Sequence, residues 1–213
     1  MYLDSTSFSI YFLNKETNTW DSVVSTTNTS KGIFQGYDGR IYLFDDDVTN
    51  YAFAIIEKSG LNHILTITSP SPSGGFLGAY KTMQGFYVWY DATLQSIYKI
   101  QNNNIICYNQ TVPVGNSLSQ VAVTDDGKIF LIVNEFGLFR LKQIISDDNY
   151  PVLSSFGPDG TFKIDSLDDN HLVITSHGNT SGYNGLFIYN ISERKIEKFI
   201  TTEDVIALYV PRF

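Results

Sequence analysis

An internal repeat of about 43 residues is the feature that most limits the possible folds of this sequence. Four segments contain a strand, a turn and a very apolar second strand, and they are GIFQGYDGRIYLF, GFLGAYKTMQGFYVWY, SQVAVTDDGKIFLIV and TFKIDSLDDNHLVIT. The predicted second strands begin at Ile41, Phe86, Ile129 and Leu172, at spacings of 45, 43 and 43 residues. Turn-forming residues precede them, at Asp38-Gly39, Gly85, Asp126-Gly127 and Asp169-Asn170. Because these residue types tolerate the left-handed backbone of tight hairpins, we assign them first to turns and only second to a catalytic or binding role.

Two more predicted strands complete each repeat. The third strands comprise residues 53–57, 96–100, 137–141 and 185–189. The fourth strands comprise residues 64–69, 105–112, 152–156 and 196–201, and they are more polar, as outer edge strands should be. Four short antiparallel strands in a repeat of about 40 to 50 residues are the pattern of one blade of a β-propeller.

The same register connects the end of the chain with its beginning. One further period after Leu172 runs past Phe213 and returns to Tyr2. Residues 1–4, 8–13 and 19–24 then supply a second, third and fourth strand, and residues 205–210 supply the missing first strand. Such closure would pair strand edges that an open ring leaves exposed. We therefore predict an all-β, five-bladed propeller of four-stranded antiparallel blades, with residues 1–213 forming a single domain.

Composition agrees with an all-β chain but does not select the architecture. The 213 residues are 43% hydrophobic and include 14 Tyr and 15 Phe, which suits pleated, half-buried surfaces. A β-sandwich or a two-domain β protein has the same composition. Neither alternative predicts a register that passes from the end of the chain to its beginning, so the repeat favours the propeller.

On this repeat the chain resembles the β-propeller superfamily over its whole length. By size it is similar to the smallest five-bladed members, which include lectins of the tachylectin type. It lacks the Gly-His and Trp-Asp pairs of WD40 repeats, and the double glycine of kelch repeats occurs only at Gly74-Gly75. The segment SFGPDGTF at residues 155–162 has the composition of a sialidase Asp-box without its spacing. The resemblance therefore implies a fold and no specific family.

Charge and hydropathy argue against two classes of partner. The formal net charge is -8 and Lys and Arg total 14, so we expect no binding to nucleic acid. No segment reaches the roughly 18 to 20 consecutive apolar residues of a membrane span, so we expect no membrane insertion. The beginning, MYLDSTSFSI, lacks the features of a signal peptide. We expect a cytoplasmic protein or part of an assembly such as a virion, or a secreted protein if the natural chain begins further upstream, and the oligomeric state stays open.

The sequence contains no evident catalytic constellation. The predicted innermost strands place seven residues at the central channel, and Asp165 is the only carboxylate among Gln35, Tyr37, Tyr80, Gln120, Lys163, Asp165 and Tyr209. A glycosidase needs two carboxylates about 5 to 10 Å apart. His63, His171 and His177 have no metal-site spacing, and we expect the first two to be exposed or capped strand residues. We therefore predict no enzymatic activity, no cofactor and no metal.

The connections between second and third strands are the predicted binding surface, because function in such folds tends to lie on loops held by a rigid scaffold. The candidate ligand-binding residues there are Asp45, Asp47, Tyr51, Trp89, Tyr90, Asp91, Glu135, Phe136, His177, Tyr183 and Asn184. The run Asp45-Asp46-Asp47 has no EF-hand spacing, which favours a solvated loop over a calcium site.

Such side chains suit a protein partner, since aromatic residues anchor interfaces, and they also suit a glycan, whose rings stack on aromatic faces. Packing of the aromatics between blades, with the aspartates merely solvated, is a further interpretation. We expect a non-catalytic binding or scaffold module that contacts another macromolecule. A carbohydrate-binding lectin is the alternative, followed by a glycosidase.

Overall fold

The computed structural model describes residues 2–4, 9–14, 16–25, 30–47, 49–57, 59–70, 75–91, 95–110, 117–146, 149–179, 182 and 184–200. These residues form β-strands joined by turns. Within this part of the chain, no helix is long and apolar enough to cross a membrane.

The strands form five antiparallel sheets in chain order. The first sheet has three strands, β1 (Tyr2–Asp4), β2 (Ser9–Asn14) and β3 (Thr19–Ser25). The second has β4 (Ser30–Gln35), β5 (Ile41–Asp46), β6 (Asn50–Glu57) and β7 (Gly60–Thr68). The third has β8 (Gly75–Thr82), β9 (Gly85–Asp91), β10 (Gln95–Gln101) and β11 (Asn104–Gln110). The fourth has β12 (Ser117–Val123), β13 (Ile129–Glu135), β14 (Leu138–Ile144) and β15 (Val152–Gly157), and the fifth has β16 (Thr161–Ser166), β17 (His171–His177), β18 (Gly185–Asn190) and β19 (Lys195–Ile200).

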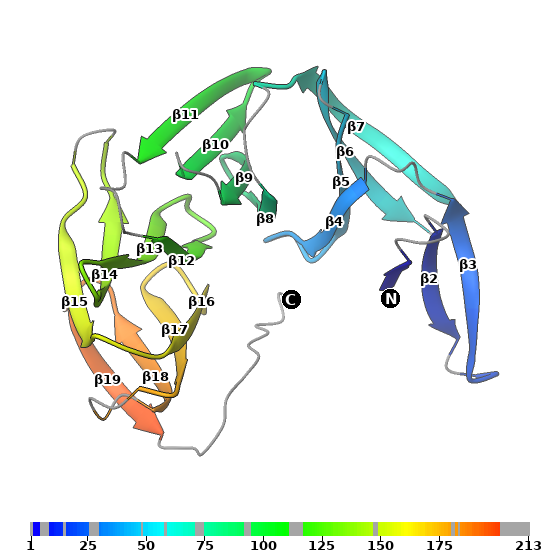
Figure 1. Cartoon of the computed structure of the whole chain (residues 1–213). Helices are drawn as coiled ribbons and strands as arrows, with labels where there is room; N and C mark the ends of the chain where they lie inside the picture. The colour runs from blue at the N-terminus through cyan, green and yellow to red at the C-terminus, as the bar shows by residue number, and fades with distance from the viewer. Residues whose placement is uncertain are drawn as a thin grey trace.

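The five sheets follow one another around a common centre, with β4, β8, β12 and β16 innermost and β3, β7, β11, β15 and β19 outermost (Figure 1). This is the architecture of a β-propeller in which each sheet is one blade, so the predicted fold class is confirmed. The closing strand predicted at residues 205–210 lies outside the described residues. The closure of the ring therefore stays a prediction.

The hydrophobic core lies between neighbouring sheets. Each of its four clusters of buried residues combines side chains of two consecutive sheets. Phe53 of the second sheet stacks on Phe86 of the third with a centroid distance of 4.1 Å, and Phe156 of the fourth sheet lies 5.3 Å from Phe162 of the fifth. The second, third and fourth sheets each have a neighbouring sheet on both faces, so the central residues of their second strands are buried and apolar. These apolar runs contribute to the strong repeat signal in the sequence.

Predicted strand boundaries are accurate for the second strands and less so for the outer ones. β5 and β13 begin at Ile41 and Ile129 as predicted. β7 begins at Gly60, four residues before the predicted start, because the exposed polar residues Asn62 and His63 interrupt the hydrophobic pattern of its first half. β14 begins at Leu138, since Gly137 belongs to a turn.

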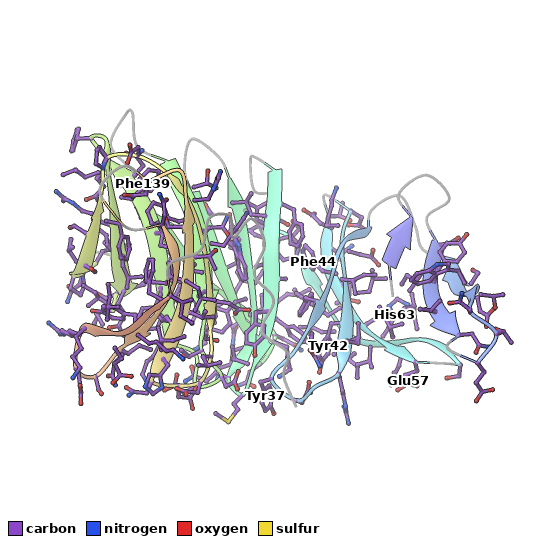
Figure 2. The ribbon with its side chains drawn as sticks, turned by 90° about the horizontal axis from the view of Figure 1, so that it is seen from below. Tyr37, Tyr42, Phe44, Glu57, His63 and Phe139 are labelled. Atoms are coloured by element: carbon purple, nitrogen blue, oxygen red, sulfur yellow. The ribbon has the colours of Figure 1, made fainter. Side chains whose placement is uncertain are left out.

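The connections lie on two opposite faces of the molecule. Phe139, beside the β13–β14 connection, lies at one end of the sheets, and Tyr37 and Glu57 lie at the other (Figure 2). We call the first the loop face, formed by the connections β5–β6, β9–β10, β13–β14 and β17–β18. The second is the turn face, formed by the turns β4–β5, β8–β9, β12–β13 and β16–β17 together with the turns before each outermost strand.

Candidate binding surface on the loop face

The β5–β6 connection is a turn organised by Asp47. Its Oδ1 accepts hydrogen bonds from the backbone N–H of Thr49 at 3.0 Å and from the Thr49 hydroxyl at 2.8 Å, as well as from the backbone N–H of Asn50. The hydrogen bonds from Thr49 and Asn50 lower the pKa of the Asp47 carboxyl, which keeps it ionised. Asp45 is half-buried within β5. Asp47 therefore presents a charge at the surface, while its Oδ1 already stabilises the turn.

Tyr51 and Tyr90 belong to the core between the second and third sheets. Their exposed fractions are 0% and 2%, and their rings stack with a centroid distance of 6.2 Å. The Tyr90 hydroxyl donates a hydrogen bond to Asp46 Oδ2 at 2.8 Å. Burial, followed by hydrogen bonds with Tyr51 and Asp46, raises the pKa of Tyr90 far above its usual value. The two rings join neighbouring blades and are not presented to a partner.

Trp89 is half-buried against the core between the third and fourth sheets. A Cβ atom added at Gly78, its cross-strand neighbour, would lie 2.5 Å from Cζ2 of the indole. The indole therefore covers the backbone of Gly78. This packing is possible because residue 78 has no side chain. The side chain of Asp91 and all of Tyr183 lie outside the described residues.

Glu135 forms ion pairs with two basic side chains beside the β13–β14 connection. Its Oε2 lies 2.9 Å from Arg140 Nη1, and its Oε1 pairs with the Lys142 ammonium. The side chains of Glu135 and Lys142 are each 14% exposed. The pairing register of β13 and β14 places all three residues on one side of the sheet. Both carboxylate oxygens are thus engaged, and the cluster carries one net positive charge.

Phe136 is 80% exposed, the largest exposed fraction among the large hydrophobic residues of the described chain. It occupies the first central position of the two-residue β13–β14 turn, where its φ is 50° and that of Gly137 is 81°. Positive φ at both positions defines a type I′ turn, which favours Asn-Gly. A bulky residue with positive φ is strained by about 1 to 2 kcal/mol. The chain thus holds an aromatic ring in solvent at a conformational cost.

Asn179 and Asn184, at the two ends of the β17–β18 connection, are hydrogen-bonded to each other. Asn184 accepts a hydrogen bond from the backbone N–H of Asn179 at 2.6 Å and donates one to its carbonyl at 2.9 Å. Asn179 is 2% exposed, and its amide donates to the carbonyls of Phe156 and Asp159, both at 2.8 Å. Asn184 is therefore a positioning residue for this connection. His177, at the end of β17, is exposed.

The structure places some of the predicted residues at the surface of the loop face and others in the core. Asp47, Phe136 and His177 are exposed there, on three different sheets. Tyr51, Tyr90 and Trp89 pack between sheets. Arg140 and Lys142 were not among the predicted residues, although the alternation along 138–142 after a two-residue turn places both on the side of Glu135.

His171 lies on the turn face between two carboxylates. Its Nδ1 is 2.9 Å from Asp168 Oδ2, and its Nε2 is 3.3 Å from Glu197 Oε2. The hydrogen bond with Asp168 raises the pKa of His171. His171 is therefore capped, as predicted for this residue. No group of three or more His, Cys, Asp or Glu side chains within the described ranges is arranged to hold a metal ion.

Comparisons with solved structures relate the chain to propeller proteins. A protein of unknown function from Bacteroides caccae has a TM-score of 0.55 at 14% sequence identity, over 94% of this chain and 71% of that one. Virginiamycin B lyase from Staphylococcus aureus has a TM-score of 0.55 at 16% identity, over 91% of this chain and 63% of the lyase. Hydrazine synthase from Kuenenia stuttgartiensis has a TM-score of 0.53 at 14% identity, over 86% of this chain and 57% of the synthase.

These identities support the fold alone, because propellers with unrelated functions share it. The chain spans less than two thirds of the lyase and of the synthase chain. No protein-family model and no curated protein sequence matches it.

Proposed function

We propose that this chain is a non-catalytic binding module whose loop face contacts another protein, with Phe136 as the anchor, as part of a larger assembly such as a virion. The observation that carries the proposal is the strained and 80% exposed ring of Phe136. Backbone strain of this kind is retained where function needs it, and buried aromatic anchors provide much of the binding energy of protein interfaces. Pairing of β13 with β14 as far as Glu135 and Leu138 holds the backbone on both sides of the turn that carries the ring.

The neighbours of Phe136 support the same conclusion. Leu138 follows the turn and is 39% exposed, so two apolar side chains flank Gly137. The ion pairs of Glu135 with Arg140 and Lys142 lie behind them and form a polar border. An apolar centre with a charged rim is the usual anatomy of a protein interface.

The decisive variant is Phe136→Asn. Asparagine suits the left-handed position of a type I′ turn, so the variant is expected to be more stable by about 1 kcal/mol while it loses its partner. Capture from the native source with the immobilised chain, followed by mass spectrometry and a melting curve, measures both effects. Ile106→Thr, which removes an exposed apolar side chain from β11, is the matched control and should retain the partner. Equal capture by the wild type and Phe136→Asn contradicts the proposal.

Carbohydrate binding is the second candidate function, because the face of an exposed aromatic ring can stack on a sugar. Of the aromatic candidates whose side chains are described, Phe136 alone is exposed, which leaves a single stacking platform. A glycan array separates the two candidates. Binding of a glycan by the wild type and its loss in Phe136→Asn would favour the lectin, whereas a wild type that binds no glycan on the array contradicts it.

A further inference from the structure

The turn face contains a cavity of about 450 Å³ between the third and fourth sheets. Its lining residues come from the β8–β9 and β12–β13 turns and from β10, β11, β13 and β14, and they include Gln84, Lys99, Tyr108, Asp126, Lys128 and Ile144. Cavities of about 300 to 1,000 Å³ are the usual size of small-molecule sites. This one lies on the face opposite Phe136.

The ammonium of Lys99 is the unusual group of this cavity. Its Nζ donates a hydrogen bond to Gln84 Oε1 at 2.6 Å and lies 5.8 Å from the centroid of the Tyr87 ring. No carboxylate of the described residues lies within ion-pair distance of it. An ammonium has three N–H donors, so two of them are left for a further acceptor. Burial lowers the pKa of Lys99, as expected for a cation whose partner is neutral.

The other charges of the cavity cancel. Lys128 Nζ lies 2.6 Å from Asp126 Oδ2 and donates a hydrogen bond to the Asp169 carbonyl at 3.1 Å. The lining therefore has one uncompensated positive charge, in a chain whose net charge is -8. A single negative charge on a ligand would balance it. A dianion such as phosphate would add charge beside Asp126 and is disfavoured.

Part of the lining of the cavity is apolar. Ile129 and Ile144 are 3% and 7% exposed and belong to the core between the two sheets, and the Tyr108 ring packs against the same core. These side chains can contact a hydrocarbon body, while the polar lining residues remain beside Lys99. We propose that the cavity binds a monocarboxylate with a compact apolar body, its carboxylate on Lys99 and its body against Ile129, Ile144 and Tyr108.

Sodium benzoate is the probe and benzamide is its neutral isostere. Titration of the full chain, followed by amide NMR spectra at low ionic strength near neutral pH, should show saturable shifts at Gly127 and at the Gln84 side chain with benzoate. Benzamide should bind at least 10-fold more weakly. No saturable shift with benzoate, or equal affinity for both compounds, overturns the proposal without the use of any variant.

Variants then test the role of Lys99. Lys99→Met should weaken benzoate binding at least 10-fold, and Lys99→Arg, which keeps the charge, should retain most of it. Lys195→Met removes a lysine from the solvent-exposed side of the fifth sheet and should leave the affinity unchanged. An equal loss in Lys99→Met and Lys195→Met would indicate general charge attraction and overturn the site. Phe136→Asn should bind benzoate as the wild type does, so the cavity and the proposed loop-face interface can fail independently.

Discussion

Gly85 occupies a position on the turn face where a methyl group would collide with the backbone. Its φ is 151°, and a Cβ atom there would lie 2.2 Å from the carbonyl oxygen of Ile100. The sequence marks this glycine as a turn residue, but the contact with β10 is visible only in the folded sheet. The third blade thus depends on a close approach of two strands, which no local pattern reveals.

We expect Gly85→Ala to lower the free energy of unfolding by more than about 1 kcal/mol, because both the backbone conformation and the space are unsuited to a side chain. Gly75→Ala is the control, since a Cβ atom at Gly75 meets no atom within 4 Å, and its effect should stay within about 0.5 kcal/mol. Urea unfolding followed by tryptophan fluorescence measures both. Similar values for the two variants would show that the Ile100 contact relaxes without cost.

We expect the free energy of unfolding to depend on pH through the protonation of His171. The hydrogen bond with Asp168 raises its pKa above the unfolded-state value of about 6.5. Its contribution is therefore fully present below pH 6.5 and is lost as the pH rises through the folded-state pKa. We expect the difference in unfolding free energy between wild type and His171→Gln to be larger at pH 5.5 than at pH 8.5. A difference that is the same at both pH values would exclude a contribution from the imidazolium.

At the scale of elements, polar contacts on the turn face repeat from one sheet to the next. The backbone N–H of Tyr37 donates to the carbonyl of Lys81, and that of Met83 donates to the carbonyl of Asp125. The backbone N–H of Asp126 donates to Asp169 Oδ1 at 2.9 Å. Turn residues that the sequence assigns to individual hairpins therefore also connect neighbouring blades. This second role requires the blades to be adjacent, so it depends on the tertiary structure.

The hydrogen bond from Tyr90 to Asp46 is the corresponding contact near the loop face. A double-mutant cycle with Tyr90→Phe, Asp46→Ala and the double variant should give a coupling energy of about 1.5 to 3 kcal/mol, the range for a hydrogen bond to a charged group. Urea unfolding of the four proteins measures it. Coupling near zero would mean that the two side chains stabilise their sheets independently.

At the scale of the whole molecule, the first and fifth sheets each have one face without a neighbouring sheet among the described residues. Leu13 and Trp20, a cross-strand pair of the first sheet, are 40% and 49% exposed, whereas Ile10 on the opposite side is 0% exposed. Ile10 packs against the second sheet. Two exposed apolar side chains on one face of a blade are expected where no neighbouring blade covers that face. The described residues do not include the predicted closing strand, so closure of the ring by residues 205–210 stays a prediction.

Deletion of residues 203–213 tests that closure. If residues 205–210 form the innermost strand of the first blade, the deletion removes that strand and should lower the melting temperature by 10 °C or more. In a chain of this size, each kcal/mol of lost stability lowers the melting temperature by about 2 to 4 °C. Deletion of residues 211–213 alone is the control, because it leaves the predicted strand intact. An unchanged melting temperature after the longer deletion would contradict closure by this segment.

The sequence by itself determined the repeat, the fold class and the starts of the second strands, since the alternation and the turn residues of each blade are local properties of the chain. The sequence also included Phe136 among the eleven candidate binding residues, because it lies in a predicted connection between a second and a third strand. The sequence does not show which aromatic residues are exposed and which are buried. Phe136 and Tyr90 were both predicted for the binding surface, and only the packing of neighbouring sheets brings Tyr90 into contact with Asp46 and Tyr51.

Only the tertiary structure decided which side chains meet across the blades. Lys99, Asp126 and Ile144 are separated along the chain and carry no common motif, yet they line one cavity. Side chains between two sheets depend on the relative placement of both, which is a long-range property that no periodicity of about 43 residues encodes.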